Sequence, residues 1–366
     1  MQGTGSNIQD VIAAGEILEA VIKGRRLRPE EISVLFEHGH LLELGQAAAA
    51  VRRLKTDGAE ATYIIDRNIN YTNVCIYRCR FCAFYRPKGH EEAYVLSADE
   101  IAEKVAETVA AGGTGILLQG GVHPDIGLED YEIMLRSLKS TFPQIHLHAF
   151  SVPEIWYIAK VEQRPVREVI QRMMDAGLDS IPGGGAEILE DETRKRILSR
   201  AKAPTRVWLD VHREAHDLGL RTTGTMMFGV GEPISARVEH LMGIRDLQDK
   251  TGGFTAFIPW TFQDFQTDLE GEVKTSGGFD YLKTLAISRL ALDNVEHVQG
   301  SWVTQGPKMG ETSLFFGADD LGSIMLEENV VAAAGAEYRM SQADMERIIS
   351  DAGFRPRQRR TLYEPL

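Results

Sequence analysis

The sequence contains little cysteine, and its three cysteines all lie within one short segment. Cys75, Cys79 and Cys82 are spaced C-x3-C-x2-C, and the other residues of the 366-residue chain include no cysteine. A disulfide framework is therefore excluded, because it needs paired cysteines distributed along the chain. Three thiols are also one fewer than the four protein ligands of a usual structural zinc site. The cysteine content indicates a group of thiols acting together in one loop.

Long apolar runs and an excess of basic charge are also lacking. No run approaches the ~20 apolar residues that span a bilayer, so we expect no membrane association. Residues 1–10 are polar and lack the apolar region of a signal peptide. The net charge of −13 argues against general nucleic-acid binding, because this balance leaves no room for a broad basic face. Free thiols persist in a reducing compartment, so a cytoplasmic location is expected.

After residue 59, apolar strand-like segments alternate with amphipathic helices. Strands are predicted at 61–66, 114–119, 146–151, 179–181, 221–228, 255–260, 298–303 and 321–325. Such alternation implies parallel strands with right-handed crossovers. Eight repeats predict an α/β fold, a parallel (β/α)8 TIM-type barrel with its chemistry at the C-terminal ends of the strands. The last two repeats are weakly patterned, so an open barrel of six units with an extension is the alternative.

The chain divides into three parts on this interpretation. Residues 1–58 show helical periodicity and no chemical motif, and we interpret them as an N-terminal helical cap. Residues 59–330 form the barrel. Residues 331–366 form a C-terminal extension, with one helix near 344–349. The basic stretch at 355–360 is expected to wrap over the surface.

The cysteine spacing, with aromatic Phe81 just before the last cysteine, resembles the radical S-adenosylmethionine (SAM) superfamily. A [4Fe–4S] cluster is normally held by four thiolates, so three leave one iron open to a small molecule. The resemblance implies that SAM chelates this iron and is cleaved to a 5′-deoxyadenosyl radical. It also places Tyr77 and Phe81 among the cofactor-binding residues. A zinc site and three unrelated buried cysteines are the alternatives.

Segments that follow the second and third predicted strands carry candidate SAM-binding residues. The second strand is followed by Gln119, Gly120 and Gly121. The superfamily pattern here is Gly-Gly-Glu, and this chain has Val122 in place of the acid, so only the backbone role transfers. Ser151 and Glu154 follow the third strand and could hold the ribose hydroxyls of SAM. Alternatively, Glu154 only caps the next helix.

Three further features follow the fourth and fifth strands. Residues 183–185 are three glycines that let a backbone approach a ligand closely, and Ala186 and Glu187 come after them. Arg194 and Arg196 could pair with the SAM carboxylate, although such a pair is more often a solvated helix face. Met227 could contact the adenine edge or simply belong to the barrel core.

Two clusters that combine an aromatic ring with an amide follow the sixth and seventh strands. They are formed by Trp260, Gln263, Trp302 and Gln305. Tryptophan rings can wall a flat aromatic group and amides can hold hydroxyls, so the clusters predict a pocket for an aromatic, hydroxylated substrate. The alternative is that the tryptophans pack the strands against outer helices.

Several longer segments resemble the cyclic dehypoxanthinyl futalosine synthases, a radical SAM family of the futalosine route to menaquinone. The matching segments are 70–73, 82–86, 118–121, 148–151, 182–187, 260–263, 301–307 and 327–331. The cysteine loop is shared with two sister families, the aminofutalosine synthases and the Fo synthase subunits. The segments around Trp302 and Asn329 favour the first family.

This resemblance implies a ring closure in dehypoxanthine futalosine, driven by an electron from a reductant such as flavodoxin or ferredoxin. The radical takes hydrogen from ribose C4′, the carbon radical adds to the benzoate ring, and the ring then loses an electron and a proton. Three strand-end residues are candidates for accepting that proton, ranked by location as His148, Glu187 and His123. A sister radical SAM enzyme and a non-catalytic metal-binding barrel are the competing hypotheses.

Overall fold

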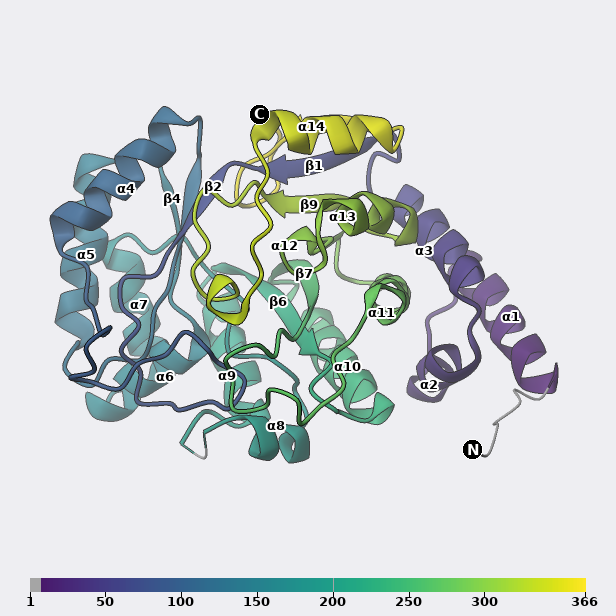
Figure 1. Ribbon diagram of the computed structural model, residues 1–366, viewed down its shortest axis with the longest axis horizontal. Coiled ribbons are helices and arrows are strands. Elements are labelled where there is room, and N and C mark those ends of the chain that lie inside the picture. Colours follow the sequence, from purple (N-terminus) through teal and green to yellow (C-terminus); the bar gives the residue numbers. More distant parts are fainter. Residues whose placement is uncertain (1–7, 200) are drawn as a thin grey trace.

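The computed structural model describes residues 8–199 and 201–366, and its centre is a curved parallel sheet (Figure 1). The polar start, where no signal peptide is expected, falls largely outside this range. The sheet contains β2 (Asp66–Ile69), β3 (Gly115–Leu118), β4 (His146–Ala149), β5 (Ser180–Ile181), β6 (Arg221–Phe228), β7 (Phe254–Thr261) and β8 (His297–Val298). These strands pair in chain order, each parallel to the next.

A second, three-stranded sheet completes the ring. It has the order β10-β1-β9, formed by β1 (Glu60–Ile64), β9 (Asp320–Ser323) and β10 (Arg355–Gln358). Only Ile65 separates β1 from β2, so one extended segment belongs to both sheets. Gly300 N donates to Asp320 O at 2.8 Å, which connects the end of β8 to β9. Eight strand positions therefore surround the lumen, and the predicted parallel barrel is confirmed.

Helices connect the strands and cover the outside of the barrel (Figure 1). They are α4 (Ala98–Ala110), α5 (Leu128–Thr141), α6 (Val152–Val161), α7 (Val166–Ala176), α8 (Asp191–Ile197), α9 (Thr205–Asp217), α10 (Ile234–Thr251), α11 (Gly278–Ala291), α12 (Trp302–Gln305), α13 (Pro307–Ser313) and α14 (Gln342–Asp351). α4 illustrates their origin: Ser97 and Glu100 form a reciprocal cap, and Ile101 and Val105 bury one face. No helix in the described part of the chain is long and apolar enough to cross a membrane.

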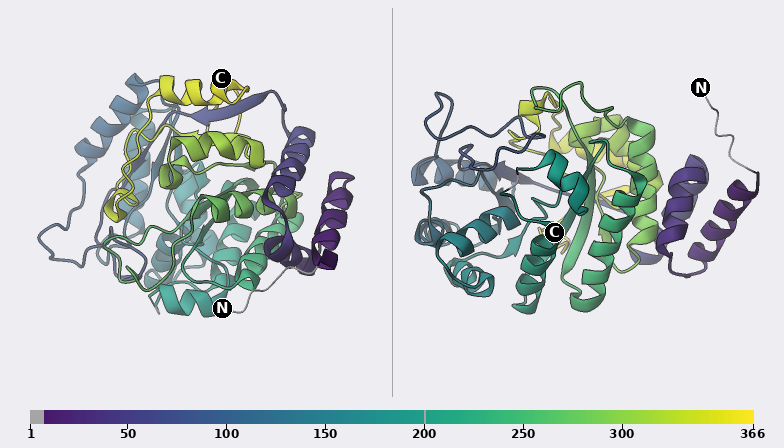
Figure 2. Two further views of the ribbon diagram at one scale, coloured as in Figure 1. Left: turned by 45° about the vertical axis from the view of Figure 1, so that its right-hand side comes forward. Right: turned by 90° about the horizontal axis from the view of Figure 1, so that it is seen from below.

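Three N-terminal helices lie on the outside of this helical layer. They are α1 (Ile8–Ile22), α2 (Pro29–His38) and α3 (Leu41–Lys55). α2 packs on α10 and α3 packs on α11, at one side of the barrel (Figures 1 and 2). Arg26 reinforces the contact by binding Asp249 at 2.8 Å and Asp293 at 2.9 Å.

The prediction of a seventh strand at 298–303 is wrong for the second half of that range. The strand contains only His297 and Val298, and Trp302 begins the helical turn α12. Two hydrogen bonds turn the chain away from the sheet: Ser301 N donates to the Tyr281 hydroxyl at 2.6 Å, and Trp302 Nε1 donates to Ser323 O at 3.0 Å.

The prediction that 355–360 wraps over the surface is also wrong. Most of this stretch forms β10, which pairs with β1 in parallel register. Arg359 is 4% exposed, and its guanidinium contacts both carboxylate oxygens of Asp320, at 2.6 and 2.8 Å. This bidentate pair lets a strongly basic segment enter the N-terminal end of the barrel.

Candidate active site

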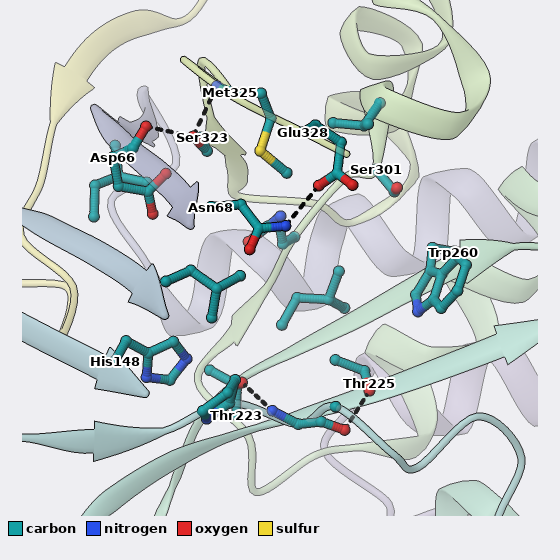
Figure 3. Close-up of a pocket in the computed structure, with 18 of the residues that line it drawn as sticks. Asp66, Asn68, His148, Thr223, Thr225, Trp260, Ser301, Ser323, Met325 and Glu328 are labelled. Carbon is teal, nitrogen blue, oxygen red and sulfur yellow. Dashed lines mark hydrogen bonds between the residues drawn. The ribbon is translucent and has the colours of Figure 1, made fainter. Parts of the chain in front are cut away.

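A cavity of about 300 Å³ occupies the barrel lumen. Part of its wall consists of inward-facing residues at alternate positions of the strands, as the pleat of a strand requires. The labelled residues in Figure 3 show the arrangement, with His148 on one side and Trp260 on the other. Lining residues from the strands, and from the position just after β3, include Asp66, Asn68, Leu117, Gln119, His148, Thr223, Thr225, Ile258, Trp260, Leu321 and Ser323.

One part of the cavity wall carries polar side chains. Asn68 donates to Glu328 at 2.9 Å, and the Glu328 carboxylate also accepts from the backbone N–H groups of Val330 and Val331 (Figure 3). Burial raises the pKa of the Asp66 carboxyl to about 6. A lumen with hydroxyls, amides and carboxyls on one wall and tryptophan on another suits a molecule that is both hydroxylated and aromatic.

The loop that carries the cysteines follows β2 and rests directly on two glycines after β3. Gly121 N donates to Thr72 O at 2.8 Å, and Ile76 N donates to Val122 O at 3.0 Å. A Cβ added to Gly121 would lie 2.3 Å from Val74 O, so no larger residue fits beneath the loop. The paired glycines therefore fix the position of the cysteine loop at the edge of the barrel.

The three thiols suit an iron–sulfur cluster better than a single metal ion. Burial raises the pKa of all three thiols, to about 11 for Cys82. Neighbouring thiolates add to the rise for Cys75 and Cys82, and the Glu187 carboxylate adds to it for Cys79. Strong positive charge is thus needed to hold them deprotonated. Among the described residues, no three His, Cys, Asp or Glu side chains surround one ion. A cluster does not require that, because each thiolate binds a different iron.

A buried ion pair lies beside the cysteine loop. Lys202 Nζ is 2.8 Å from Glu187 Oε1 and 5.2 Å from the centre of the Phe81 ring. Glu187 lines the cavity, adopts a left-handed backbone with φ of 40°, and keeps Oε2 buried without a hydrogen bond. The charge of Lys202 also lowers the pKa of Cys79 against the effect of burial. An unsatisfied carboxylate oxygen at this place is a ready acceptor for a donor of a bound cofactor.

Ser151 and Glu154 form a reciprocal cap at the start of α6. The Glu154 carboxylate accepts from Ser151 N at 2.6 Å, Ser151 Oγ at 2.5 Å, the Tyr71 hydroxyl at 2.5 Å and Gly120 N at 3.2 Å. Only 1% of Glu154 is exposed. In this structure Glu154 therefore caps α6, as the alternative interpretation expected, and ribose binding stays a prediction.

Apart from Gln119, the other predicted cofactor residues do not line the cavity. Arg194 is buried and donates to the backbone carbonyls of residues 185, 186, 188 and 203, so it stabilises the glycine loop. Arg196 donates to Val230 O at 2.9 Å. Met227 is fully buried in β6, and Tyr77 is 4% exposed in the cysteine loop. Gln119 does line the cavity.

The four predicted substrate residues divide into two kinds. Trp260 and Trp302 both line the cavity. Gln263 Nε2 donates to Thr261 O at 3.1 Å, and Gln305 Nε2 donates to Thr261 Oγ1 at 2.5 Å. Neither amide lines the cavity in this structure, because both side chains donate hydrogen bonds to Thr261 instead.

The three candidates for the proton acceptor occupy different surroundings. His148 lines the lumen, and its Nδ1 is 2.6 Å from Ser180 Oγ. Burial lowers the pKa of His148 to about 3, so its imidazole is neutral near pH 7. Glu187 lines the cavity next to the cysteine loop. His123 lies outside the cavity, and its Nδ1 accepts from Asp125 N at 3.1 Å.

Several cavity residues were not predicted from the sequence. They include Asp66, Asn68, Thr223, Thr225, Glu328 and Tyr363. The first four could have been found by period-two alternation, since each lies an even number of positions from another lumen residue of its strand. Glu328 and Tyr363 have no such signal, because loops far along the chain bring them to the barrel.

The fold and the cysteine site define a radical SAM enzyme, and comparison with known proteins agrees. Residues 69–242 match the family model for the radical SAM superfamily, and residues 251–366 match the CofH/MqnC C-terminal region. The chain belongs to the radical SAM superfamily, in the branch with this C-terminal region. Its cofactors are a [4Fe–4S] cluster and SAM, and the cluster ligands fit Cys75, Cys79 and Cys82.

Particular relatives match almost the whole chain. The cyclic dehypoxanthine futalosine synthase of Streptomyces coelicolor is 48% identical, covering 96% of this chain and 88% of that protein. The enzyme of the same name from Halalkalibacterium halodurans is 45% identical, covering 95% and 94%. The aminodeoxyfutalosine synthase of Thermus thermophilus is 38% identical, covering 95% and 94%.

Solved structures share the fold at low sequence identity. Methylornithine synthase superposes with a TM-score of 0.72 at 18% identity, covering 93% of this chain and 97% of that one. The FeFe-hydrogenase maturase HydG of Carboxydothermus hydrogenoformans gives 0.76 at 16% identity, covering 98% and 82%. These likenesses show the fold alone.

Proposed function

We propose that this chain catalyses the radical cyclisation of dehypoxanthine futalosine to cyclic dehypoxanthinyl futalosine, a step of menaquinone biosynthesis. The observation that carries the proposal is the 48% and 45% identity to two synthases of that name over nearly the full chain. A lumen with both polar and aromatic lining residues, beside the cysteine loop, supports it, because the substrate carries both a sugar and a benzoate ring. The cofactors supply the 5′-deoxyadenosyl radical, and the protein supplies position and shelter from water.

The residue roles are part of this proposal. Each of the three cysteines binds one iron, and Gly120 and Gly121 place the loop. Gln119 and Glu187 border the cavity near that loop and are proposed to bind SAM, as are Tyr77, Phe81, Ser151, Glu154, Arg196 and Met227. Trp260 and Trp302 are proposed to flank the benzoate, while Gln263 and Gln305 would act on the substrate only after leaving Thr261.

His148 is proposed as the group that accepts the proton from the cyclised ring. It faces the lumen, it is neutral near pH 7 because burial lowers its pKa, and its other nitrogen is already oriented by Ser180. Glu187 is the second candidate, and its Oε1 is already paired with Lys202 Nζ at 2.8 Å.

The partners and setting complete the proposal. The chain would receive its electron from a flavodoxin or ferredoxin, act in the cytoplasm, and bind neither nucleic acid nor membrane. The boundaries at residues 58 and 330 stay predictions: the helices before the first pack on α10 and α11, and the segment after the second enters the base of the barrel.

The direct test is anaerobic reconstitution with iron, sulfide, SAM, reductant and dehypoxanthine futalosine, followed by mass analysis. We expect one 5′-deoxyadenosine for each cyclised product. Formation of 5′-deoxyadenosine without consumption of the added substrate would contradict the assignment.

Aminodeoxyfutalosine synthase is the second candidate, because the Thermus enzyme matches 95% of the chain at 38% identity. Offering a carboxyvinyloxybenzoate in place of dehypoxanthine futalosine separates the two. Turnover of the vinyl ether alone would replace the first proposal by the second.

A further inference from the structure

Ser180 bridges two histidines inside the barrel. Its Oγ is 2.6 Å from Nδ1 of His148 and 2.7 Å from Nε2 of His146. Ser180 itself is fully buried at the start of β5, opposite His148 in the register of β4 and β5. One hydroxyl has a single proton and can accept at least one more, so it can connect a donor ring to an acceptor ring.

The three side chains run along the barrel axis, from the cavity toward its N-terminal end. His148 lines the cavity, whereas His146 lies two residues earlier on the same strand, about 6.5 Å deeper. His148 Nε2 has no partner in the described part of the chain, and Figure 3 shows its ring at the cavity wall. Of the two histidines, His148 therefore lines the cavity and His146 does not.

The outer end reaches partly exposed groups. His146 is half-buried, and the charges of Asp179, Lys139 and Glu364 act on it. Glu364 is exposed and belongs to the C-terminal tail. The tail approaches His146 because the neighbouring residue of β3 is Gly115. A Cβ at Gly115 would lie 2.5 Å from Thr361 Oγ1, so only glycine leaves room for the tail. A proton on His146 therefore has a short route to solvent.

We propose that Ser180 and His146 form a proton relay that carries the proton released by the substrate ring from His148 to the N-terminal end of the barrel. The inference rests on the proposed function, whose last step releases one proton inside the barrel lumen. A buried base with no outlet would have to be recharged by opening the cavity, which would expose radical chemistry to water.

The transfers balance as follows. The C–H bond of the attacked ring carbon breaks, its proton binds His148 Nε2, and its electron pair restores aromaticity, with one electron leaving to an oxidised iron–sulfur centre. His148 Nδ1–H passes its proton to Ser180 Oγ, and the former Ser180 proton passes to His146 Nε2. His146 then releases one proton outward. Ser180 and His146 act through His148 and are positioning residues rather than catalytic ones.

The relay requires particular tautomers, which can be measured without turnover. His148 must carry its proton on Nδ1 and His146 must have a free Nε2. The measurement is ¹⁵N NMR of the cluster-containing protein with labelled histidine rings. We expect His148 to be protonated on Nδ1 and His146 to be unprotonated on Nε2. In Ser180→Ala we expect the tautomer population of His148 to change. A proton on His148 Nε2 as the dominant form would overturn the proposal, since the ring could not accept from the cavity.

The second measurement uses substrate that carries deuterium on the attacked ring carbon. In Ser180→Ala and His146→Gln we expect 5′-deoxyadenosine to form at the wild-type rate, the cyclised product to form at least ~10-fold more slowly, and a primary isotope effect larger than in the wild type. Ser180→Thr keeps the hydroxyl and should restore coupling. Ser288→Ala removes an equally buried hydroxyl from helix α11, and should resemble the wild type.

A general folding defect would lower both products together and leave the isotope effect unchanged. That result, or product formation within twofold of the wild type in both relay variants, would overturn the relay. The proposed function is tested separately by the wild-type reaction. If the wild type forms the cyclised product and the relay variants behave like it, or lose 5′-deoxyadenosine and cyclised product together, the relay fails while the proposed function stands.

Discussion

At the scale of single residues, the chemistry depends on side chains that have no substitute in the chain. Each iron-binding thiolate is unique, because the sequence holds three cysteines and all three lie in the loop after β2. The cavity is likewise walled by two tryptophans whose surroundings differ. Trp260 is partly exposed to the lumen, whereas Trp302 is 1% exposed and anchored by its Nε1–H.

Cys79→Ala should abolish the cluster. A site with three protein ligands cannot lose one and keep the same coordination, and no spare thiolate lies elsewhere in the chain. Iron and sulfide analysis after anaerobic reconstitution measures this, together with the visible absorbance of the cluster. Ile76→Ala, in the same loop but partly exposed, should keep four irons per chain. Four irons in Cys79→Ala would show that the cysteine assignment is wrong.

Trp302→Ala should raise KM for the substrate while SAM cleavage without substrate stays near normal. The expected physical cause is loss of the flat surface against the benzoate, and the cost in stability is about 3–5 kcal/mol because the side chain is buried. Trp302→Phe separates the two effects, since it keeps a ring but removes the hydrogen bond to Ser323. An unchanged KM in both variants would place the substrate elsewhere.

At the scale of secondary structure elements, the C-terminal tail closes the base of the barrel. β10 pairs with β1, and beyond it Tyr363 stacks on His297 with ring centres 3.8 Å apart. Arg359 lies 3.8 Å from the Tyr363 ring centre and binds Asp320 of β9. The tail is thus fixed by an ion pair and two ring contacts, and Arg359, Thr361 and Tyr363 become part of the cavity wall.

Arg359→Met should destabilise the fold by about 3–5 kcal/mol, because it leaves the fully buried Asp320 carboxylate without its partner. Urea unfolding of the apoprotein at pH 7.5 gives the free energy directly. Arg355→Met is the matched control: its ion pair with Asp57 at 3.3 Å is exposed and should contribute less than about 1 kcal/mol. Equal midpoints for the two variants would mean that the tail does not stabilise the barrel.

At the scale of the whole molecule, the barrel and its inner helices bury several histidines in neutral form. Burial lowers the pKa of His148 and His240 to about 3 and that of His216 to about 4. Asp66 acts in the opposite direction, because burial raises its pKa to about 6. Burial likewise raises the pKa of Glu154 and Glu328 and lowers that of His212. We expect the histidines to dominate the response to mild acid, because their ordinary pKa lies at the start of that range.

Stability should therefore fall as the pH drops below about 6.5. The unfolded histidines bind protons at their ordinary pKa, whereas the folded ones resist until about pH 4 or lower, so each contributes a loss of up to about 1.4 kcal/mol per pH unit in that window. Asp66 offsets part of this between about pH 6 and 4. Urea midpoints at pH 7.5, 6.0 and 5.0 measure the slope. His240→Gln should flatten it and the exposed His40→Gln should not; a flat wild-type profile would contradict the prediction.

The sequence by itself determined the parallel barrel, the cofactors and the family. Strand and helix periods are local properties, and three cysteines within eight residues cannot lie far apart, so both follow without tertiary information. The Gly120–Gly121 pair was equally readable, because close approach of two backbones leaves a glycine signature.

Only the tertiary structure decided which residues outside the strands line the lumen. Glu328, Arg359 and Tyr363 reach the cavity through loops, and no local period marks them. Lys202 meets Glu187 across a gap of fifteen residues, and Ser180 meets His146 and His148 across neighbouring strands. Such contacts depend on register and on the path of the chain, which are set by packing of the whole barrel rather than by any short segment.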